Sequence, residues 1–142
     1  MSAKSPIIVD TSAFFAGTRK LRTIIEKGER LLTIDLIVFE FTKVLEDEIR
    51  RSVGSGNTKR AEMLRGLRDR FPKLLSDLEI NVTSPEFSST DVNRLYSMIS
   101  KGLDSGDAMI WIKMQKAGCD TILTDNVSDW RELGAKVVTF DQ

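Results

Sequence analysis

The sequence of 142 residues contains no histidine and only one cysteine, Cys119. The absence of histidine excludes Ser-His-Asp and Cys-His catalysis, histidine acid–base chemistry and every metal site that needs an imidazole ligand. A single thiol excludes a disulfide framework and a cysteine-rich zinc site, and it is ordinary in a reducing cytoplasm. Hydrolytic chemistry is therefore left to carboxylates, as acid–base pairs or as oxygen ligands of a hard cation such as Mg²⁺ or Mn²⁺.

Long apolar runs are also missing. No segment has the length of a membrane span, and residues 1–6 lack the apolar stretch of a signal peptide. We therefore expect a cytoplasmic protein that does not enter the membrane. The 41% hydrophobic and 30% charged fractions are those of an ordinary globular protein, and the length fits a single domain over residues 1–142.

The charge is balanced in total but not along the chain. The 21 basic and 21 acidic residues cancel, yet residues 50–73 hold eight bases and two acids, whereas residues 74–142 hold six bases and eleven acids. A basic segment of this kind can hold a polyanion over an acidic site, and a solvated helix face is an equally good interpretation. The candidates for polyanion contacts are Arg50, Lys59, Arg60 and Arg65.

Apolar and β-branched runs alternate with helical patterns. Strands are predicted at residues 6–10, 31–34, 78–82, 121–124 and 136–140. Helices are predicted at 18–29, 36–51 with Asp35 as N-cap, 58–76, 89–100, 105–118 and, as a short element, 126–133. This alternation predicts an α/β domain with a parallel sheet covered on both faces, in which ligands gather outside the carboxyl ends of the strands.

Several acids lie where strands are predicted to end. Asp10 directly follows the first strand and Asp125 follows the fourth, with Asp129 four residues further on. The ordinary roles of such residues are helix caps and turns. Parallel strands, however, would bring Asp10 and Asp125 to the same edge of the sheet.

Two predicted helices carry an acid on an apolar face. Glu40 shares its face with Ile37 and Val44, so its carboxylate must be paired, protonated or bound to a cation. Asp107 begins a stripe that continues at the apolar positions 110, 111 and 114. A buried salt bridge for Glu40 and an interaction with the helix dipole for Asp107 are the alternatives. Gly106 leaves room beside Asp107 for close approach of backbone or ligand.

Carboxylates that converge on one edge of the sheet would repel one another. That repulsion raises their pKa values and destabilises the fold unless a cation neutralises it. A divalent metal held by oxygen ligands resolves the conflict and suits phosphodiester hydrolysis, because it activates water and stabilises the leaving oxygen. The sequence therefore favours a metal-dependent nuclease.

These residues resemble the PIN domain, and most closely the short, single-domain members typified by VapC toxins. The resemblance spans the chain and rests on the start Ile-Ile-Val-Asp10-Thr-Ser, on Glu40, on Gly-Asp107-Ala and on Leu-Thr-Asp125-Asn-Val-Ser-Asp129-Trp. It implies a three-layer α/β/α sandwich with a central parallel sheet and a Mg²⁺- or Mn²⁺-dependent endoribonuclease. It also implies a homodimer paired with an antitoxin protein.

Carried over residue by residue, the resemblance makes Asp10, Glu40 and Asp107 the core acids, and makes Ser12 a hydroxyl that supports the metal shell. The fourth acid departs from the family pattern, because Asn126 occupies the position two residues after Thr124 where many members carry it. Asp125 is slightly preferred and Asp129 remains an alternative. Asp104 is expected to cap its helix, and Asp104, Thr124 and Asn126 are expected to support the site.

Other classes fit less well. A stand-alone PIN-domain protein that processes or binds RNA without an antitoxin is the main alternative. A haloacid-type phosphatase needs Asp-x-Asp, but position 12 is Ser, and a dinucleotide-binding fold needs a glycine-rich first turn, which residues 10–13 lack. A receiver domain distributes its acids differently.

Overall fold

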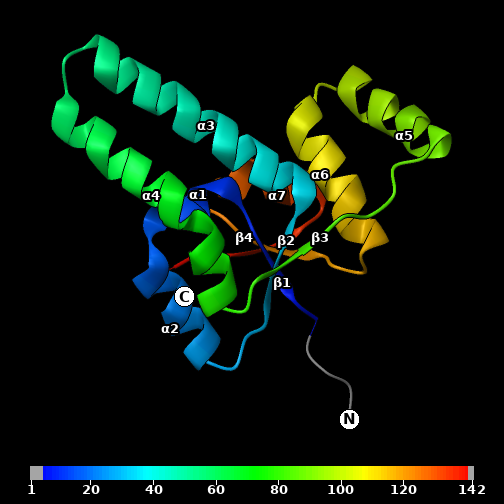
Figure 1. The fold of residues 1–142 in the computed structure, drawn as a ribbon. Helices are drawn as coiled ribbons and strands as arrows, with labels where there is room; N and C mark the ends of the chain where they lie inside the picture. Colours follow the sequence, from blue (N-terminus) through cyan, green and yellow to red (C-terminus); the bar gives the residue numbers. More distant parts are fainter. Residues whose placement is uncertain (1–4, 141–142) are drawn as a thin grey trace.

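The structure is a computed structural model that describes residues 5–140 and contains a five-stranded, entirely parallel sheet (Figure 1). The strands are β1 (Ile7–Val9), β2 (Leu31–Ile34), β3 (Asn81–Thr83), β4 (Thr121–Leu123) and β5 (Lys136–Val138), in the spatial order β3-β2-β1-β4-β5. Each residue of the central strand β1 is buried, as expected for a strand covered on both faces. The predicted parallel sheet is confirmed.

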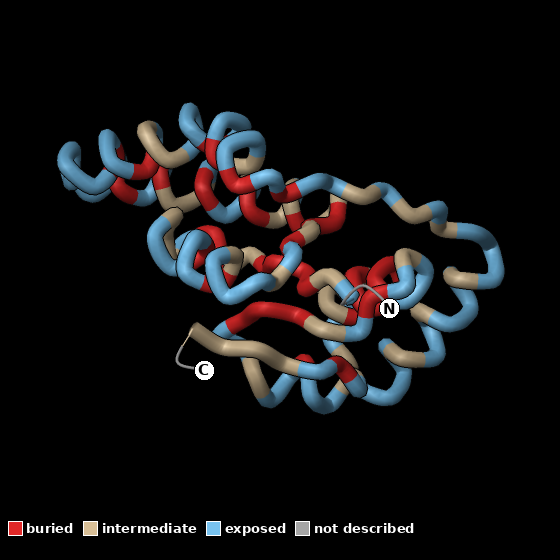
Figure 2. The backbone as a smooth tube through the Cα atoms, turned by 90° about the horizontal axis from the view of Figure 1, so that it is seen from below, coloured by how far each residue is buried: buried red, intermediate tan, exposed pale blue. Residues whose placement is uncertain are grey.

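Helices flank the sheet on both sides (Figure 2). Within the described residues they are α1 (Thr11–Ala16), α2 (Thr18–Glu26), α3 (Asp35–Gly54), α4 (Thr58–Asp77), α5 (Ser89–Ser100), α6 (Ser105–Lys116) and α7 (Val127–Leu133). Strands β2 and β3 are added on one side of β1, and β4 and β5 are then added on the other side. Right-handed crossovers therefore place α1–α4 on one face and α5–α7 on the other, in agreement with contacts between α1 and α3 and between α6 and α7. The predicted three-layer α/β/α architecture is confirmed.

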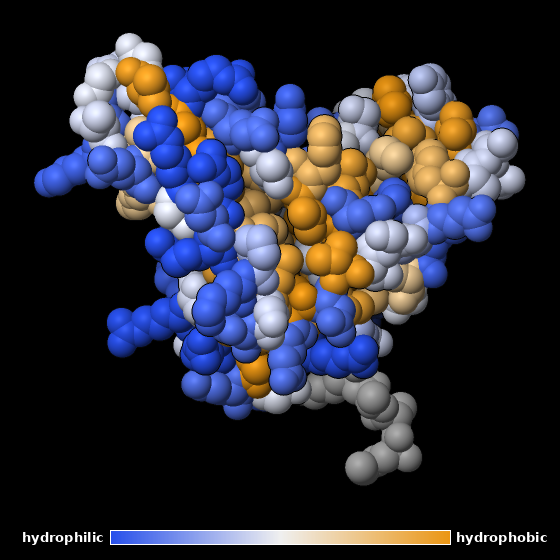
Figure 3. All heavy atoms as spheres, in the orientation of Figure 1, coloured by the Kyte–Doolittle hydropathy of each residue, from blue (hydrophilic) through white to orange (hydrophobic). Residues whose placement is uncertain are grey.

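Helices α3 and α4 form a hairpin that projects beyond the sheet (Figure 1). The apolar residues Ile37, Phe41, Leu45 and Ile49 recur every fourth position of α3 and are buried, which gives the helix its packing face. The rings of Phe14, Phe41 and Phe71 meet with centroids 4.4–5.5 Å apart and fix the base of the hairpin. Figure 3 shows hydrophilic side chains over the hairpin and apolar ones in the hollow between it and α5 and α6.

Three local predictions were wrong. Helix α1 was not predicted, because its six residues are too few to show a helical period. The third strand begins at Asn81 rather than at position 78: Leu78 and Ile80 are buried in the turn that ends α4, with Glu79 at a φ of 54° between them. Asp35 is the first residue of α3 rather than its N-cap, and its carboxylate accepts a hydrogen bond from the backbone N–H of Leu36.

The apolar stripes carrying the two helical acids differ in depth. On α6, Ile110, Trp111 and Met114 are buried, as expected for core residues. On α3, Ile37 is fully buried but Val44 is 40% exposed, so Glu40 lies at the edge of the buried stripe and not within it. None of the helices among residues 5–140 is both long and apolar enough to span a membrane. Residues 1–4 and 141–142 of the expected domain lie outside the described residues.

Candidate carboxylate site

Asp10 is placed at the centre of the sheet's carboxyl edge. It follows β1, and its backbone N–H donates to Leu123 O at the end of β4, so it lies where the strand order reverses. Its side chain does not cap α1. One carboxylate oxygen instead accepts a 2.6 Å hydrogen bond from the buried Thr124 hydroxyl. Burial raises the pKa of Asp10, while the bond from Thr124 partly counteracts that rise.

Ser12 and Thr124 join the first and fourth strand ends. The Ser12 hydroxyl accepts from the backbone N–H of Asp125 at 3.0 Å and lies 3.4 Å from the Thr124 hydroxyl. Thr124 also accepts from the backbone N–H of Asn126. These bonds hold Asp10 in one position, so the supporting roles expected for Ser12 and Thr124 have a physical basis in the positioning of Asp10.

Glu40 reaches from α3 to the first turn of α6. A Cβ atom on Gly106 would lie 2.8 Å from one Glu40 carboxylate oxygen, so a larger residue there would require the Glu40 side chain to shift. Burial, followed by the charges of Asp10, Asp107 and Asp104, raises the pKa of Glu40 to about 7. Close approach at Gly106 was predicted from the sequence, and the group that uses the room is the Glu40 carboxylate.

Asp107 lies half-buried in the first turn of α6. The Asp104 carboxylate accepts from the backbone N–H of Asp107 at 3.0 Å and caps the helix, as predicted. Burial raises the pKa of Asp107 to about 6, with further contributions from the charges of Asp104, Asp10 and Asp129. Asp10, Glu40 and Asp107 therefore come from three separate segments and act on one another electrostatically.

These three acids line one open pocket of about 590 Å³. Its remaining walls are polar and apolar side chains from α1, α3 and the β4–α7 connection, namely Thr11, Ser12, Phe15, Phe39, Lys43, Val44 and Asn126. A second pocket of about 240 Å³ is lined by Asp104, Asp107 and Asp129, among others. Asp107 thus borders both pockets.

The two candidates for the fourth acid have different neighbours. Asp125 is exposed and its charge raises the pKa of Asp10, but its side chain lines neither of these pockets. Asp129 accepts a hydrogen bond from the Asn126 side chain at 2.9 Å and borders the smaller pocket together with Asp107. Of these two candidates, Asp129 shares a pocket with Asp107 and its charge raises the pKa of Asp107, whereas the charge of Asp125 acts on Asp10.

The oxygen atoms around the larger pocket suit a hard divalent cation, because they belong to carboxylates and hydroxyls and the carboxylates carry unneutralised negative charge. The buried Thr11 hydroxyl, which borders the larger pocket, has no hydrogen-bond partner in the described structure. Within residues 5–140, however, no three acidic or cysteine side chains lie close enough together to form a preassembled metal site. The acids share a pocket but do not converge on one point.

A partly buried ion pair ties the two acid-bearing helices together. The Lys113 ammonium of α6 is buried and lies 3.1 Å from the Asp35 carboxylate at the start of α3. It also donates to the backbone oxygen of Pro85 before α5. Because Asp35 and Lys113 lie five or six residues from Glu40 and Asp107, this pair fixes the spacing of the helices that carry the two acids.

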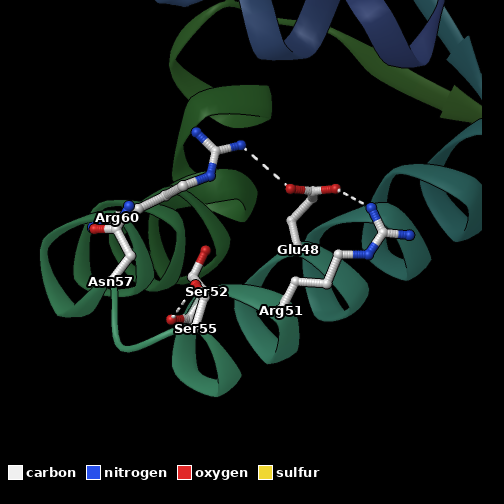
Figure 4. A network of polar contacts seen from close by, with 6 residues as sticks. All are labelled: Glu48, Arg51, Ser52, Ser55, Asn57 and Arg60. Atoms are coloured by element: carbon white, nitrogen blue, oxygen red, sulfur yellow. Dashed lines mark hydrogen bonds and ion pairs between the residues drawn. The ribbon is translucent and has the colours of Figure 1, made fainter.

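The predicted basic segment lies on the α3–α4 hairpin. Glu48 forms ion pairs with Arg51 at 2.8 Å and with Arg60 at 3.3 Å, which joins the two helices (Figure 4). Arg50 lies 3.6 Å from Asp47. Among the described residues, the other two candidates, Lys59 and Arg65, make no ion pair, and Arg65 borders a groove of about 270 Å³ together with Arg50 and Arg68.

Sequence reasoning missed four residues at the site: Phe15, Phe39, Lys43 and Trp130. Lys43 lies one turn after Glu40, and this spacing was a usable signal. Trp130 is fully buried and its indole N–H lowers the pKa of Asp10, although it makes no hydrogen bond in the described structure. Helical period leaves Phe39 outside the buried face of α3, but the sequence did not indicate that Phe39 borders the acids.

No protein-family model matches the sequence, and no curated protein does. The fold is similar to the crystal structure of PAE2754 from Pyrobaculum aerophilum, with a TM-score of 0.66 and 21% identity over 96% of this chain and 85% of that chain. It is also similar to a domain of a functionally unknown protein from Methanocaldococcus jannaschii DSM 2661, with a TM-score of 0.51 and 15% identity over 96% and 91% of the two chains. At these identities the similarity shows the fold alone.

Proposed function

We propose that this protein is a metal-dependent endoribonuclease of the PIN-domain kind that hydrolyses RNA phosphodiester bonds. The observation that carries the proposal is that Asp10, Glu40 and Asp107 border one pocket, where burial and the charge of Asp10 raise the pKa values of both Glu40 and Asp107. Structural ion pairs lower carboxylate pKa values, whereas unneutralised acids grouped in a cleft are typical of a functional site.

Asp10, Glu40 and Asp107, with Asp129 or Asp125 as the fourth acid, would hold Mg²⁺ or Mn²⁺. When bound, such an ion activates water and stabilises the leaving oxygen. The protein positions these acids: Thr124 holds Asp10, Gly106 admits Glu40 to the first turn of α6, and Asp104 caps the turn that presents Asp107. Asp10, Glu40 and Asp107 already border the same pocket, so their side chains would need to move only within it to bind one cation.

The wider biological assignment is part of the proposal. We infer a cytoplasmic toxin of the VapBC type, acting as a homodimer and held inactive by an antitoxin, on the basis of the resemblance in sequence. A stand-alone PIN-domain protein that processes or binds RNA is the second candidate. Its RNA-binding form would need no metal site, and the described acids do not form a preassembled one.

The direct test is cleavage of mixed cellular RNA with added Mn²⁺ or Mg²⁺ and with chelator. We expect fragments only when the cation is present, because the acids alone repel a phosphate. RNA that is bound but left intact under all conditions would favour the second candidate. RNA that is cut equally well in chelator would contradict a metal-dependent mechanism.

Arg65, an arginine of the hairpin that forms no ion pair with residues 5–140, should contribute to RNA affinity. We expect Arg65→Glu to weaken RNA binding about tenfold at low salt and to make the slope of log K against log salt shallower by about one, because a phosphate contact is lost. Arg65 is preferred to Arg60, whose reversal would also break the ion pair with Glu48. Binding is measured in chelator over a range of salt concentrations.

Arg22→Glu is the matched control, because Arg22 is an exposed arginine of α2 that makes no ion pair in the described part of the chain. We expect the same net charge change there to affect the slope far less. Equal slopes for the wild type and Arg65→Glu would mean that the hairpin is only a solvated surface.

A further inference from the structure

The pocket that contains the acids has an aromatic wall. Phe39 precedes Glu40 on α3 and is 61% exposed, and Phe15 of α1 is 37% exposed. The Phe15 ring lies 4.8 Å from the ring of the buried Phe41, so the wall is anchored in the core. Leaving a phenyl ring in water forgoes the stabilisation that burial would give. An exposed ring beside a polar cleft therefore indicates a surface for a ligand.

A free cation stands next to this wall. Lys43 is exposed, borders the same pocket and makes no ion pair with any residue between 5 and 140. It follows Phe39 by four positions and Glu40 by three, so the three side chains occupy neighbouring positions on the surface of α3. One pocket thus combines flat apolar rings, a cation and a group of carboxylates.

We propose that Phe39 and Phe15 form a subsite on which an unpaired nucleobase stacks, with Lys43 contacting an adjoining phosphate. Such a subsite engages only a strand with unpaired bases, because a base inside a duplex has no free face to offer a phenyl ring. This inference rests on the proposed nuclease function and assigns the residues of that site that would bind a base and its phosphate. The pocket of about 590 Å³ is of the size that accommodates small ligands.

A nucleotide matches the pocket better than an apolar side chain of a protein partner does. A base covers the rings with its π-face, and the phosphate that follows it brings negative charge to Lys43. A purely apolar side chain would cover the rings but would remove water from Lys43 and from the Glu40 carboxylate without giving either a partner. The mixture of groups around Phe39 thus favours the nucleotide.

The test compares Phe39→Ala and Phe39→Trp with the wild type in chelator, so that binding is measured without cleavage. The probes are a fluorescein-labelled single-stranded RNA of mixed sequence and the same RNA annealed to its complement. We expect Phe39→Ala to weaken single-strand binding about tenfold and duplex binding little, because one stacking platform is lost. Phe39→Trp should retain the affinity, and its emission should be quenched on binding, since Trp111 and Trp130 are both buried.

Tyr96→Ala is the matched control, because Tyr96 is an aromatic residue of α5 that is 67% exposed and does not line this pocket. It should bind the single strand as the wild type does. Unchanged single-strand binding by Phe39→Ala would overturn the inference and leave the aromatic wall to a protein partner. Equal weakening by Tyr96→Ala would also overturn it.

The inference and the proposed function fail in different ways. A wild-type protein that prefers single strands through Phe39 but cuts no RNA with Mn²⁺ retains the stacking subsite and loses the nuclease assignment. Metal-dependent cleavage that treats single strands and duplexes alike, and does not respond to Phe39→Ala, retains the nuclease and overturns the stacking subsite.

Discussion

Replacing Asp107 with Asn is expected to lower metal-dependent RNA cleavage by about 100-fold or more while the fold is retained. Asp107 borders both pockets of the site, and its amide replacement keeps the shape but removes one negative charge that would hold the cation. Loss of groups that merely orient metal ligands already costs about 10- to 100-fold, so loss of a ligand should cost at least as much. Initial cleavage rates at saturating Mn²⁺ measure the effect.

The fold of Asp107→Asn should remain intact because burial and the charges of its neighbours disfavour the Asp107 carboxylate and together raise its pKa to about 6. The thermal midpoint in metal-free buffer should equal or exceed that of the wild type. Asp120→Asn is the matched control, since Asp120 is exposed and precedes β4, at the opposite edge of the sheet. A wild-type cleavage rate in Asp107→Asn would remove Asp107, and with it the proposed site, from consideration.

The sheet could be predicted from the sequence because its strands are short apolar runs and its helices have clear periods. Ile7–Val9 and Leu31–Ile34 were located almost to the residue. The failures occur where apolar residues serve a turn. Leu78 and Ile80 look like part of a strand, yet they are buried because the chain doubles back after α4, with Ile80 N donating to Leu75 O. Only the tertiary structure shows that such residues cover the core outside a strand.

The acids could be predicted individually because each lies at a strand end or on an apolar helical stripe, and the topology then brings Asp10, Glu40 and Asp107 to one pocket. Their exact spacing could not be predicted. The depth of Glu40 depends on Gly106, and the separation of α3 from α6 depends on the pair formed by Asp35 and Lys113, two residues 78 positions apart. Long-range pairs of this kind leave no periodic signal in a single sequence.

The aromatic wall could not be predicted for the same reason, because it is formed by residues that only the tertiary structure brings together. Phe14, Phe15, Phe39 and Phe41 form two similar-looking aromatic clusters along the chain, but Phe14 and Phe41 are buried whereas Phe39 is 61% exposed. Helical period assigns Phe41 to the buried face with Ile37, and it leaves Phe39 outside that face without indicating what Phe39 contacts. The neighbouring acids and Lys43 supply that information only once α1, α3 and the β4–α7 connection are placed together.

Glu40→Gln is expected to stabilise the metal-free protein at pH 8 and to leave it unchanged near pH 4. Burial and neighbouring charges raise the pKa of Glu40 from 4.5 to about 7 in the folded state, so the folded protein holds this proton more tightly than the unfolded chain does. A raised carboxyl pKa therefore destabilises the fold progressively as the pH rises from about 4.5 to about 7, and the full cost is present above that range. Gln carries no charge and does not incur this cost.

After allowance for the partial exposure of Glu40, the gain at pH 8 should be about 1–2 kcal/mol, or roughly 3–8 °C in Tm. Thermal unfolding of both proteins from pH 4 to pH 8 in chelator measures it, with the exposed Glu62→Gln of α4 as the control. Saturating Mn²⁺ should reverse the order of stability, because a cation that binds the folded wild type more tightly than Glu40→Gln stabilises the wild type more. A large loss of Tm in Glu40→Gln in chelator would instead identify Glu40 as a structural partner, since relief of repulsion cannot lower the stability of the fold.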